Sequence, residues 1–172
     1  MIRPGRPEDA ERLREIEREA GRRFADVGLP EIAADEPPAA ERLEAYAAAG
    51  RCWVALDPDG APAGYVIVDV VDGCAHVEQL SVLPHHQGKG LGRRLLGAVE
   101  AWGAGRGLRA LTLTTFADVP WNRPLYEHLG FRCLAEDELG PGLAGVRDAE
   151  AAHGLDPSSR VAMRRELPAR ER

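Results

Sequence analysis

Long apolar runs, cysteine and lysine are scarce in this sequence, and each scarcity excludes something. No apolar run approaches the roughly 20 residues that a membrane-spanning helix needs. Residues 1–11 are rich in charge and contain no apolar stretch, so no secretory signal is visible. The three cysteines lie far apart without a Cys-x-x-Cys pair, which argues for reduced thiols and against a metal site. Lys89 is the only lysine, a skew towards arginine that is typical of codon bias. We expect a cytoplasmic protein without metal.

What is present is ordinary for one globular domain. Of the 172 residues, 44% are hydrophobic and 29% are charged, which is enough for a buried core and excludes a disordered chain. The formal net charge of −6 argues against nucleic acid as the main partner. No repeat or linker divides the chain, so we expect a single domain over residues 1–172.

Hydrophobic periodicity predicts a mixed order of helices and strands. Helical spacing of apolar residues predicts four helices, over residues 7–24, 39–49, 88–104 and 122–129. β-branched or alternating segments predict six strands, over residues 52–56, 64–71, 74–83, 109–115, 131–134 and 161–167. Turns join the first three strands as antiparallel neighbours, and the last two strands should pair. This order predicts an α/β or α+β domain with a mixed sheet.

Two further segments are predicted to lie outside this regular pattern. Residues 28–38 contain three prolines and are predicted to form a loop. Residues from about 135 to 160 form an acidic insertion before the last strand, and its centre is predicted to hold a short helix. Such an acidic segment favours a cationic partner, although a solvated surface is the commoner outcome.

A glycine-rich turn joins the predicted strand over residues 74–83 to the predicted helix over residues 88–104. Gly88, Gly90 and Gly92 remove side chains from the turn, so successive backbone amides can face one anion, and the helix start adds unpaired donors. Without a ligand, these glycines would cost up to about 1 kcal/mol each relative to alanine. We therefore predict a phosphate or pyrophosphate site.

Spacing excludes two common nucleotide-binding loops at this turn. The dinucleotide fingerprint needs a third glycine where Arg93 stands. The Walker A loop needs serine or threonine after its lysine, whereas Lys89 is followed by Gly90.

Two segments resemble signatures of the GNAT family of N-acetyltransferases. LSVLPHHQGKGLGRRLL, residues 80–96, resembles the acetyl-coenzyme A (acetyl-CoA) signature, and Gln87 to Gly92 match its Q/R-x-x-G-x-G/A core. NRPLYEHLGF, residues 122–131, is similar to the second signature. The resemblance implies a GNAT-like, splayed mixed sheet flanked by helices, with acetyl-CoA as cofactor. It also implies direct acetyl transfer to a primary amine in a ternary complex and a homodimer as a possible assembly.

The resemblance also implies which residues bind the cofactor. The backbone of Ser81, Val82 and Leu83 would pair with the pantetheine arm, and the amide near Val82 would hold the thioester carbonyl. The pyrophosphate would be held by Gln87, Gly88, Lys89, Gly90, Leu91, Gly92 and Arg93. Asn122 is a further candidate contact, and helix capping is its alternative role. Pro124 departs from the N-x-x-A spacing that is usual before the family's tyrosine.

Three residues are candidates for the chemistry, in which an ammonium loses a proton and a thiolate leaves. Tyr126 matches the family's tyrosine near the coenzyme A sulfur and is the candidate proton donor, with aromatic packing as the alternative. Glu78 and His76 share one face of their strand by alternation. Glu78 is the first candidate for the general base and His76 the second; either one is otherwise a satisfied polar residue. Asp118 is a candidate contact for the substrate amine.

Three functions stay open from the sequence. The first is an N-acetyltransferase for a small-molecule or peptide amine, with no nucleic-acid or membrane partner. The second is a non-catalytic acyl-CoA sensor or interaction module that lacks a working base, and the third is an unrelated nucleotide-binding domain. No motif identifies the acceptor. The N-terminal helices, Trp121 and the acidic insertion are the regions expected to define it.

Overall fold

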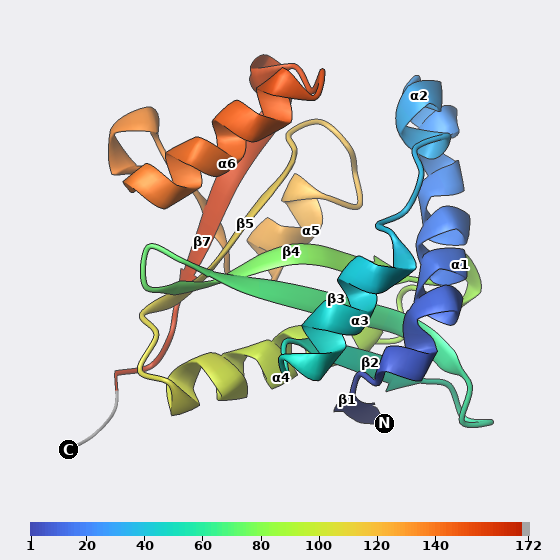
Figure 1. Ribbon diagram of the computed structural model, residues 1–172. Coiled ribbons are helices and arrows are strands. Elements are labelled where there is room, and N and C mark those ends of the chain that lie inside the picture. The colour runs from blue at the N-terminus through green and yellow to red at the C-terminus, as the bar shows by residue number, and fades with distance from the viewer. Residues whose placement is uncertain (170–172) are drawn as a thin grey trace. The chain divides into compact units, whose positions relative to one another are not determined.

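The computed structural model describes residues 1–169 (Figure 1). By their contacts, these residues divide into two compact units. The first unit comprises residues 1–68 and 77–99, and the second comprises residues 69–76 together with the chain from Glu100 onwards. Three elements belong partly to each unit: β3 (Pro62–Val71), β4 (Cys74–Val82) and α4 (Leu91–Gly105). Among the described residues, seven strands form one mixed sheet in the order β1-β2-β3-β4-β5-β7-β6. The predicted fold class is confirmed.

The first unit combines short strands with the N-terminal helices. Its elements are β1 (Ile2–Pro4), α1 (Ala10–Gly21), α2 (Pro30–Ala33), α3 (Ala40–Ala48) and β2 (Cys52–Leu56), with parts of β3, β4 and α4. β2 pairs antiparallel with both β1 and β3. Leu13 and Ile16 recur at helical spacing on α1 and are fully buried, and α1 packs against α3. The apolar face predicted for this helix is therefore the face that is buried in the first unit.

β1 and α2 lie where the sequence predicts neither strand nor helix. β1 has only three residues, and its bonds to β2 define it rather than an alternating pattern. α2 is one turn that begins with Pro30, a residue tolerated at that position, and it interrupts the predicted loop. The ends of the other predicted elements agree with the structure to within three residues.

The second unit is built around β5 and β7. Its further elements are β5 (Ala110–Phe116), α5 (Arg123–His128), β6 (Arg132–Cys133), α6 (Pro141–Ala152) and β7 (Arg160–Glu166). β4 and β5 are parallel where Ala75 pairs with Leu111, whereas β7 runs antiparallel to both β5 and β6. The predicted pairing of the last two strands is confirmed, and β7 also inserts next to β5. The insertion contains a twelve-residue helix, α6, which is tied to β5 and β7 by Glu150 (Figure 1).

Buried side chains fix the elements that carry the site. Leu91 and Leu95 are buried on the first turns of α4, so the loop before this helix leaves from an anchored point. Within the described residues, no helix combines the length and apolar character that a membrane crossing requires. The same residues contain no group of three His, Cys, Asp or Glu side chains arranged to hold a metal ion.

Candidate functional site

The glycine-rich turn lies between β4 and α4. Gly88 and Gly90 have φ values of 76° and 81°, in the left-handed region that favours glycine. Gly92 instead lies in the first turn of α4, and a Cβ added there would meet no protein atom within 4 Å. Backbone conformation therefore explains two of the three glycines. At Gly92 neither the backbone conformation nor a protein neighbour requires glycine, and the open space leaves room for a ligand.

Six consecutive backbone amides, from Gly88 to Arg93, donate no hydrogen bond within the described part of the chain. The first helical bond after them runs from the Arg94 amide to the Gly90 carbonyl at 3.1 Å. Lys89, Arg93 and Arg94 are exposed beside these amides and form no ion pair with any described residue. Open amides, a helix N-terminus and three cations together fit a diphosphate. The sequence predicts a phosphate or pyrophosphate site from the same residues, apart from Arg94.

Gln87 braces the turn from within the protein. Its Nε2 donates to the Val82 carbonyl oxygen at 3.0 Å, and its Oε1 accepts a short hydrogen bond from Arg23. Because one amide atom faces an acceptor and the other a donor, only this orientation satisfies both partners. Gln87 therefore supports the turn with its side chain. Burial lowers the pKa of Arg23, a residue that the sequence did not single out.

The end of β4 is only partly open to a ligand. The Leu83 amide donates to the Ala63 carbonyl at 2.8 Å, so it is already used. Ser81 is buried, and its hydroxyl accepts from the Gln79 side chain at 3.0 Å. Of the three strand-end residues predicted to bind pantetheine, Leu83 therefore has an amide that is not available to the ligand.

Glu78 projects from β4 towards α3, where it meets Arg42. Its Oε1 accepts from Arg42 Nη2 at 3.0 Å, and the two side chains are 30% and 49% exposed. An ion pair as exposed as this contributes under about 1 kcal/mol. The Arg42 guanidinium also lies 3.5 Å from the Tyr46 hydroxyl and 5.6 Å from its ring centroid. Burial lowers the pKa of Arg42, but the hydrogen bonds with Glu78 and Tyr46 outweigh this and raise it overall.

A second carboxyl group lies within range of the same arginine. The buried Tyr65 on β3 donates its hydroxyl to Glu17 on α1 at 2.6 Å. Burial raises the pKa of Glu17, and the Tyr65 hydrogen bond and the charge of Arg42 oppose that rise. Burial also raises the pKa of Tyr65 well above its ordinary value. Helices α1 and α3 thus carry Glu17 and Arg42 to one face of β3 and β4 (Figure 1).

Three other predicted site residues belong to the second unit. His76 is 2% exposed, and its Nδ1 lies 3.0 Å from the Thr112 hydroxyl. Tyr126 on α5 packs edge to face with Phe131 at a centroid distance of 5.7 Å, and burial raises its pKa to about 12. Asn122 stands at the N-cap of α5, but its side chain makes no capping bond among the described residues. The capping alternative for Asn122 therefore has no support in its geometry.

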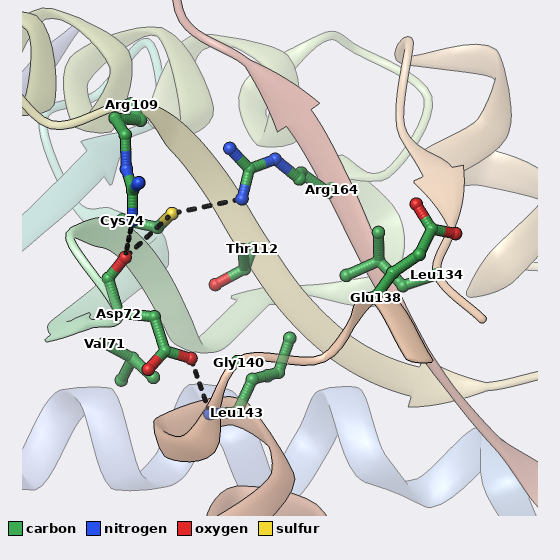
Figure 2. A pocket seen from close by; sticks show the side chains of 10 residues that line it. All are labelled: Val71, Asp72, Cys74, Arg109, Thr112, Leu134, Glu138, Gly140, Leu143 and Arg164. Carbon is green, nitrogen blue, oxygen red and sulfur yellow. Dashed lines mark hydrogen bonds between the residues drawn. The ribbon is translucent and has the colours of Figure 1, made fainter. Parts of the chain in front are cut away.

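A cavity of about 180 Å³ in the second unit marks where the insertion meets the β3–β4 turn (Figure 2). The carboxylate of Asp72 accepts from the backbone amides of Gly142 and Leu143, each at 2.8 Å, at the start of α6. Its carbonyl oxygen accepts from Arg109 at 2.5 Å. These polar groups are hydrogen-bonded to one another. They therefore hold the insertion against the β3–β4 turn and are not available to bind a ligand in the cavity.

Half of the six acidic residues of the insertion form ion pairs with arginines inside the second unit. Three ion pairs are formed: Glu136 with Arg147 at 3.6 Å, Glu138 with Arg132 at 2.7 Å, and Glu150 with Arg160 at 2.5 Å. The sequence suggested an acidic rim that would favour a cationic acceptor. Arginines offset three of these six carboxylates, so only part of the acidic charge of the insertion could attract a cation.

The family model named Acetyltransferase (GNAT) family matches residues 10–131, which is most of the chain. The chain therefore belongs to the GNAT acetyltransferase family, and the predicted resemblance is confirmed. The protein is an acyltransferase of this class, and acetyl-CoA is its cofactor. The family match excludes the unrelated nucleotide-binding domain.

Solved structures share the fold along nearly the whole chain. PaiA N-acetyltransferase from Thermoplasma acidophilum, solved with coenzyme A, is 19% identical with a TM-score of 0.72, over 96% of this chain and 98% of that one. A GNAT acetyltransferase from Staphylococcus aureus Mu50 is 15% identical with a TM-score of 0.73, over 98% and 99%. The ribosomal-protein-S18-alanine N-acetyltransferase from Escherichia coli is 19% identical with a TM-score of 0.66, over 99% and 96%. At these identities the likeness shows the fold.

Proposed function

We propose that this acetyltransferase transfers the acetyl group of acetyl-CoA to the primary amine of a small molecule or peptide, by direct attack in a ternary complex. The observation that carries the proposal is the run of six open amides before and within the first turn of α4. These amides, with Lys89, Arg93 and Arg94, would hold the diphosphate. When bound, acetyl-CoA supplies an activated acetyl thioester.

Glu78 is the proposed base in this reaction. Its carboxylate is 30% exposed, so it can accept the proton of an incoming amine directly or through one water. His76 is the second candidate, because its ring is buried and its Nδ1 is bonded to Thr112. Loss of the base should therefore be tested first at Glu78.

Tyr126 is the proposed hydrogen-bond donor to the leaving sulfur. With a pKa of about 12, its phenol keeps its proton at neutral pH and is available as a donor. Ser81 and Val82 are the proposed backbone contacts for the pantetheine arm. Asn122 is a proposed side-chain contact for coenzyme A, since capping does not occupy its amide.

We also propose that the chain acts as one acetyltransferase domain, because the family match runs through both units. A bacterial, cytoplasmic enzyme and a homodimer are further proposals that rest on composition and family resemblance. Sedimentation velocity of the full chain tests the dimer.

A thiol-release screen tests the proposed function. The full chain is mixed with acetyl-CoA and a panel of primary amines, and free thiol is followed with a chromogenic disulfide. At least one amine should release thiol, and Glu78→Gln should abolish release while still binding acetyl-CoA in titration calorimetry. Glu41→Gln, an exposed change on α3, is the matched control and should keep turnover. Binding of acetyl-CoA without release by any amine would instead identify a sensor.

A further inference from the structure

The carboxylate that the proposed reaction needs already has a cation bound to it. The Arg42 guanidinium donates to Glu78 Oε1 at 3.0 Å. An ammonium that approaches the same oxygen would meet a like charge, which repels it. At Oε1 a protonated amine must therefore compete with Arg42 for Glu78.

We propose that the acceptor binds as an ammonium ion and replaces the Arg42 guanidinium at Glu78. Arg42 is then a positioning residue: it holds the Glu78 side chain before substrate arrives and competes with the incoming ammonium, whereas Glu78 supplies the preference for cationic amines over neutral isosteres. This inference rests on the proposed role of Glu78 as the base.

The surroundings of Arg42 make such an exchange feasible. Both partners reach solvent, with side chains 49% and 30% exposed for Arg42 and Glu78, so water and substrate can enter the pair. Arg42 also has a second partner in Tyr46, whose hydroxyl lies 3.5 Å away and whose ring faces the guanidinium at 5.6 Å. When Glu78 is released to the substrate, the guanidinium therefore keeps favourable contacts.

Glu17 is a further acidic group whose electrostatics involve Arg42. The Arg42 charge acts on the Glu17 carboxyl, which the Tyr65 hydroxyl holds at 2.6 Å. Tyr65 holds Glu17 on the α1 side, so Glu17 is an acidic group near the displaced guanidinium. Glu78, by contrast, is the carboxylate that Arg42 binds until the substrate ammonium replaces the guanidinium.

Equilibrium binding to the full chain without acetyl-CoA tests the exchange. The probe is propylammonium, and propanol is its uncharged isostere. In protein labelled with ¹⁵N-arginine, the Nε–H signal of Arg42, assigned by its loss in Arg42→Lys, should shift saturably with propylammonium and not with propanol. Arg42→Gln removes the competing cation, so propylammonium affinity should rise by about two- to fivefold, the range expected for an exposed ion pair.

Control variants separate exchange from a structural role. Arg42→Lys should restore wild-type affinity, Glu78→Gln should remove the preference for the charged probe, and Glu41→Gln on the same helix should change nothing. If Arg42 only supported the fold, Arg42→Gln would lower the melting temperature without altering the ratio of propylammonium to propanol affinity. That result, or the absence of any saturable Arg42 shift in the wild type, would overturn the proposal. Because no turnover is measured, these outcomes are independent of the thiol-release screen.

Discussion

Replacement of Tyr126 by phenylalanine tests how the leaving thiolate is stabilised. Burial raises the pKa of the Tyr126 phenol to about 12. An ordinary thiol has a pKa of about 8.5, so complete proton transfer from this phenol to a thiolate would be uphill by about 5 kcal/mol. The phenol should therefore donate a hydrogen bond to the sulfur as charge develops, without giving up its proton permanently.

The size of the expected effect follows from that role. A hydrogen bond to a charged acceptor contributes about 1.5–3 kcal/mol, so kcat of Tyr126→Phe should fall about 10- to 150-fold. Acetyl-CoA affinity should not change, because the charge that the phenol stabilises exists only during the reaction. Since the raised pKa of Tyr126 lies far above neutrality, its ionisation should cause no loss of rate below about pH 10.

Steady-state kinetics by thiol release, repeated from neutral to alkaline pH, measure this prediction. Phe131→Leu is the matched packing control, because it removes the edge-to-face ring contact and keeps the hydroxyl. That variant should lose stability but keep most of kcat. Wild-type kcat in Tyr126→Phe would refute the reasoning and leave Tyr126 as a packing residue.

Three further predictions concern the stability of the fold and of the glycine-rich turn between β4 and α4. Asp72→Ala should lower the free energy of unfolding by about 1–2 kcal/mol in urea titrations, because the first turn of α6 loses its acceptor. A loss under about 0.5 kcal/mol would contradict a capping role for Asp72. Tyr65→Phe should cost about 1–2 kcal/mol at neutral pH, because the Glu17 carboxyl loses its donor. Burial raises the pKa of Glu17, so its contribution should be complete below the ordinary carboxyl pKa and be lost as pH rises through the raised value, and Glu17→Gln should remove this part of the pH dependence. In the same urea titrations, Gly90→Ala should lose about 1–2 kcal/mol of stability, because alanine is strained at the left-handed φ of Gly90. Gly92→Ala, in the open helical turn, should gain about 0.5–1 kcal/mol. Equal effects would disprove that Gly90 and Gly92 are glycines for different reasons.

Local patterns explain which elements the sequence predicted. The apolar run at Cys52–Leu56 lies between turn signals, and β2 has those bounds. β1 was missed because three residues carry no periodicity and its existence depends on backbone pairing with β2. The place of β7 between β5 and β6 was missed for a related reason, since strand order depends on long-range pairing that no local pattern encodes.

The same distinction applies to the candidate site. The proposed cofactor segment could be singled out because its donors are consecutive and its glycines mark the left-handed positions at Gly88 and Gly90. On the proposed acceptor side the sequence singled out Glu78 but not its contacts, because these join residues far apart in sequence: Arg42 and Glu78 are 36 positions apart, and Glu17 and Tyr65 are 48 apart. On its own, Arg42 looks like any solvated charge on a helix.

The bond between Asp72 and α6 has a practical consequence for shortening this chain. Asp72 and Gly142 are 70 positions apart, yet the Asp72 carboxylate accepts from the Gly142 amide and so caps the N-terminus of α6. A deletion that trims the insertion would leave that carboxylate facing a surface from which its donors have gone. Shortened versions should therefore replace Asp72 in the same step, ideally with glycine, which also accepts its φ of 53°.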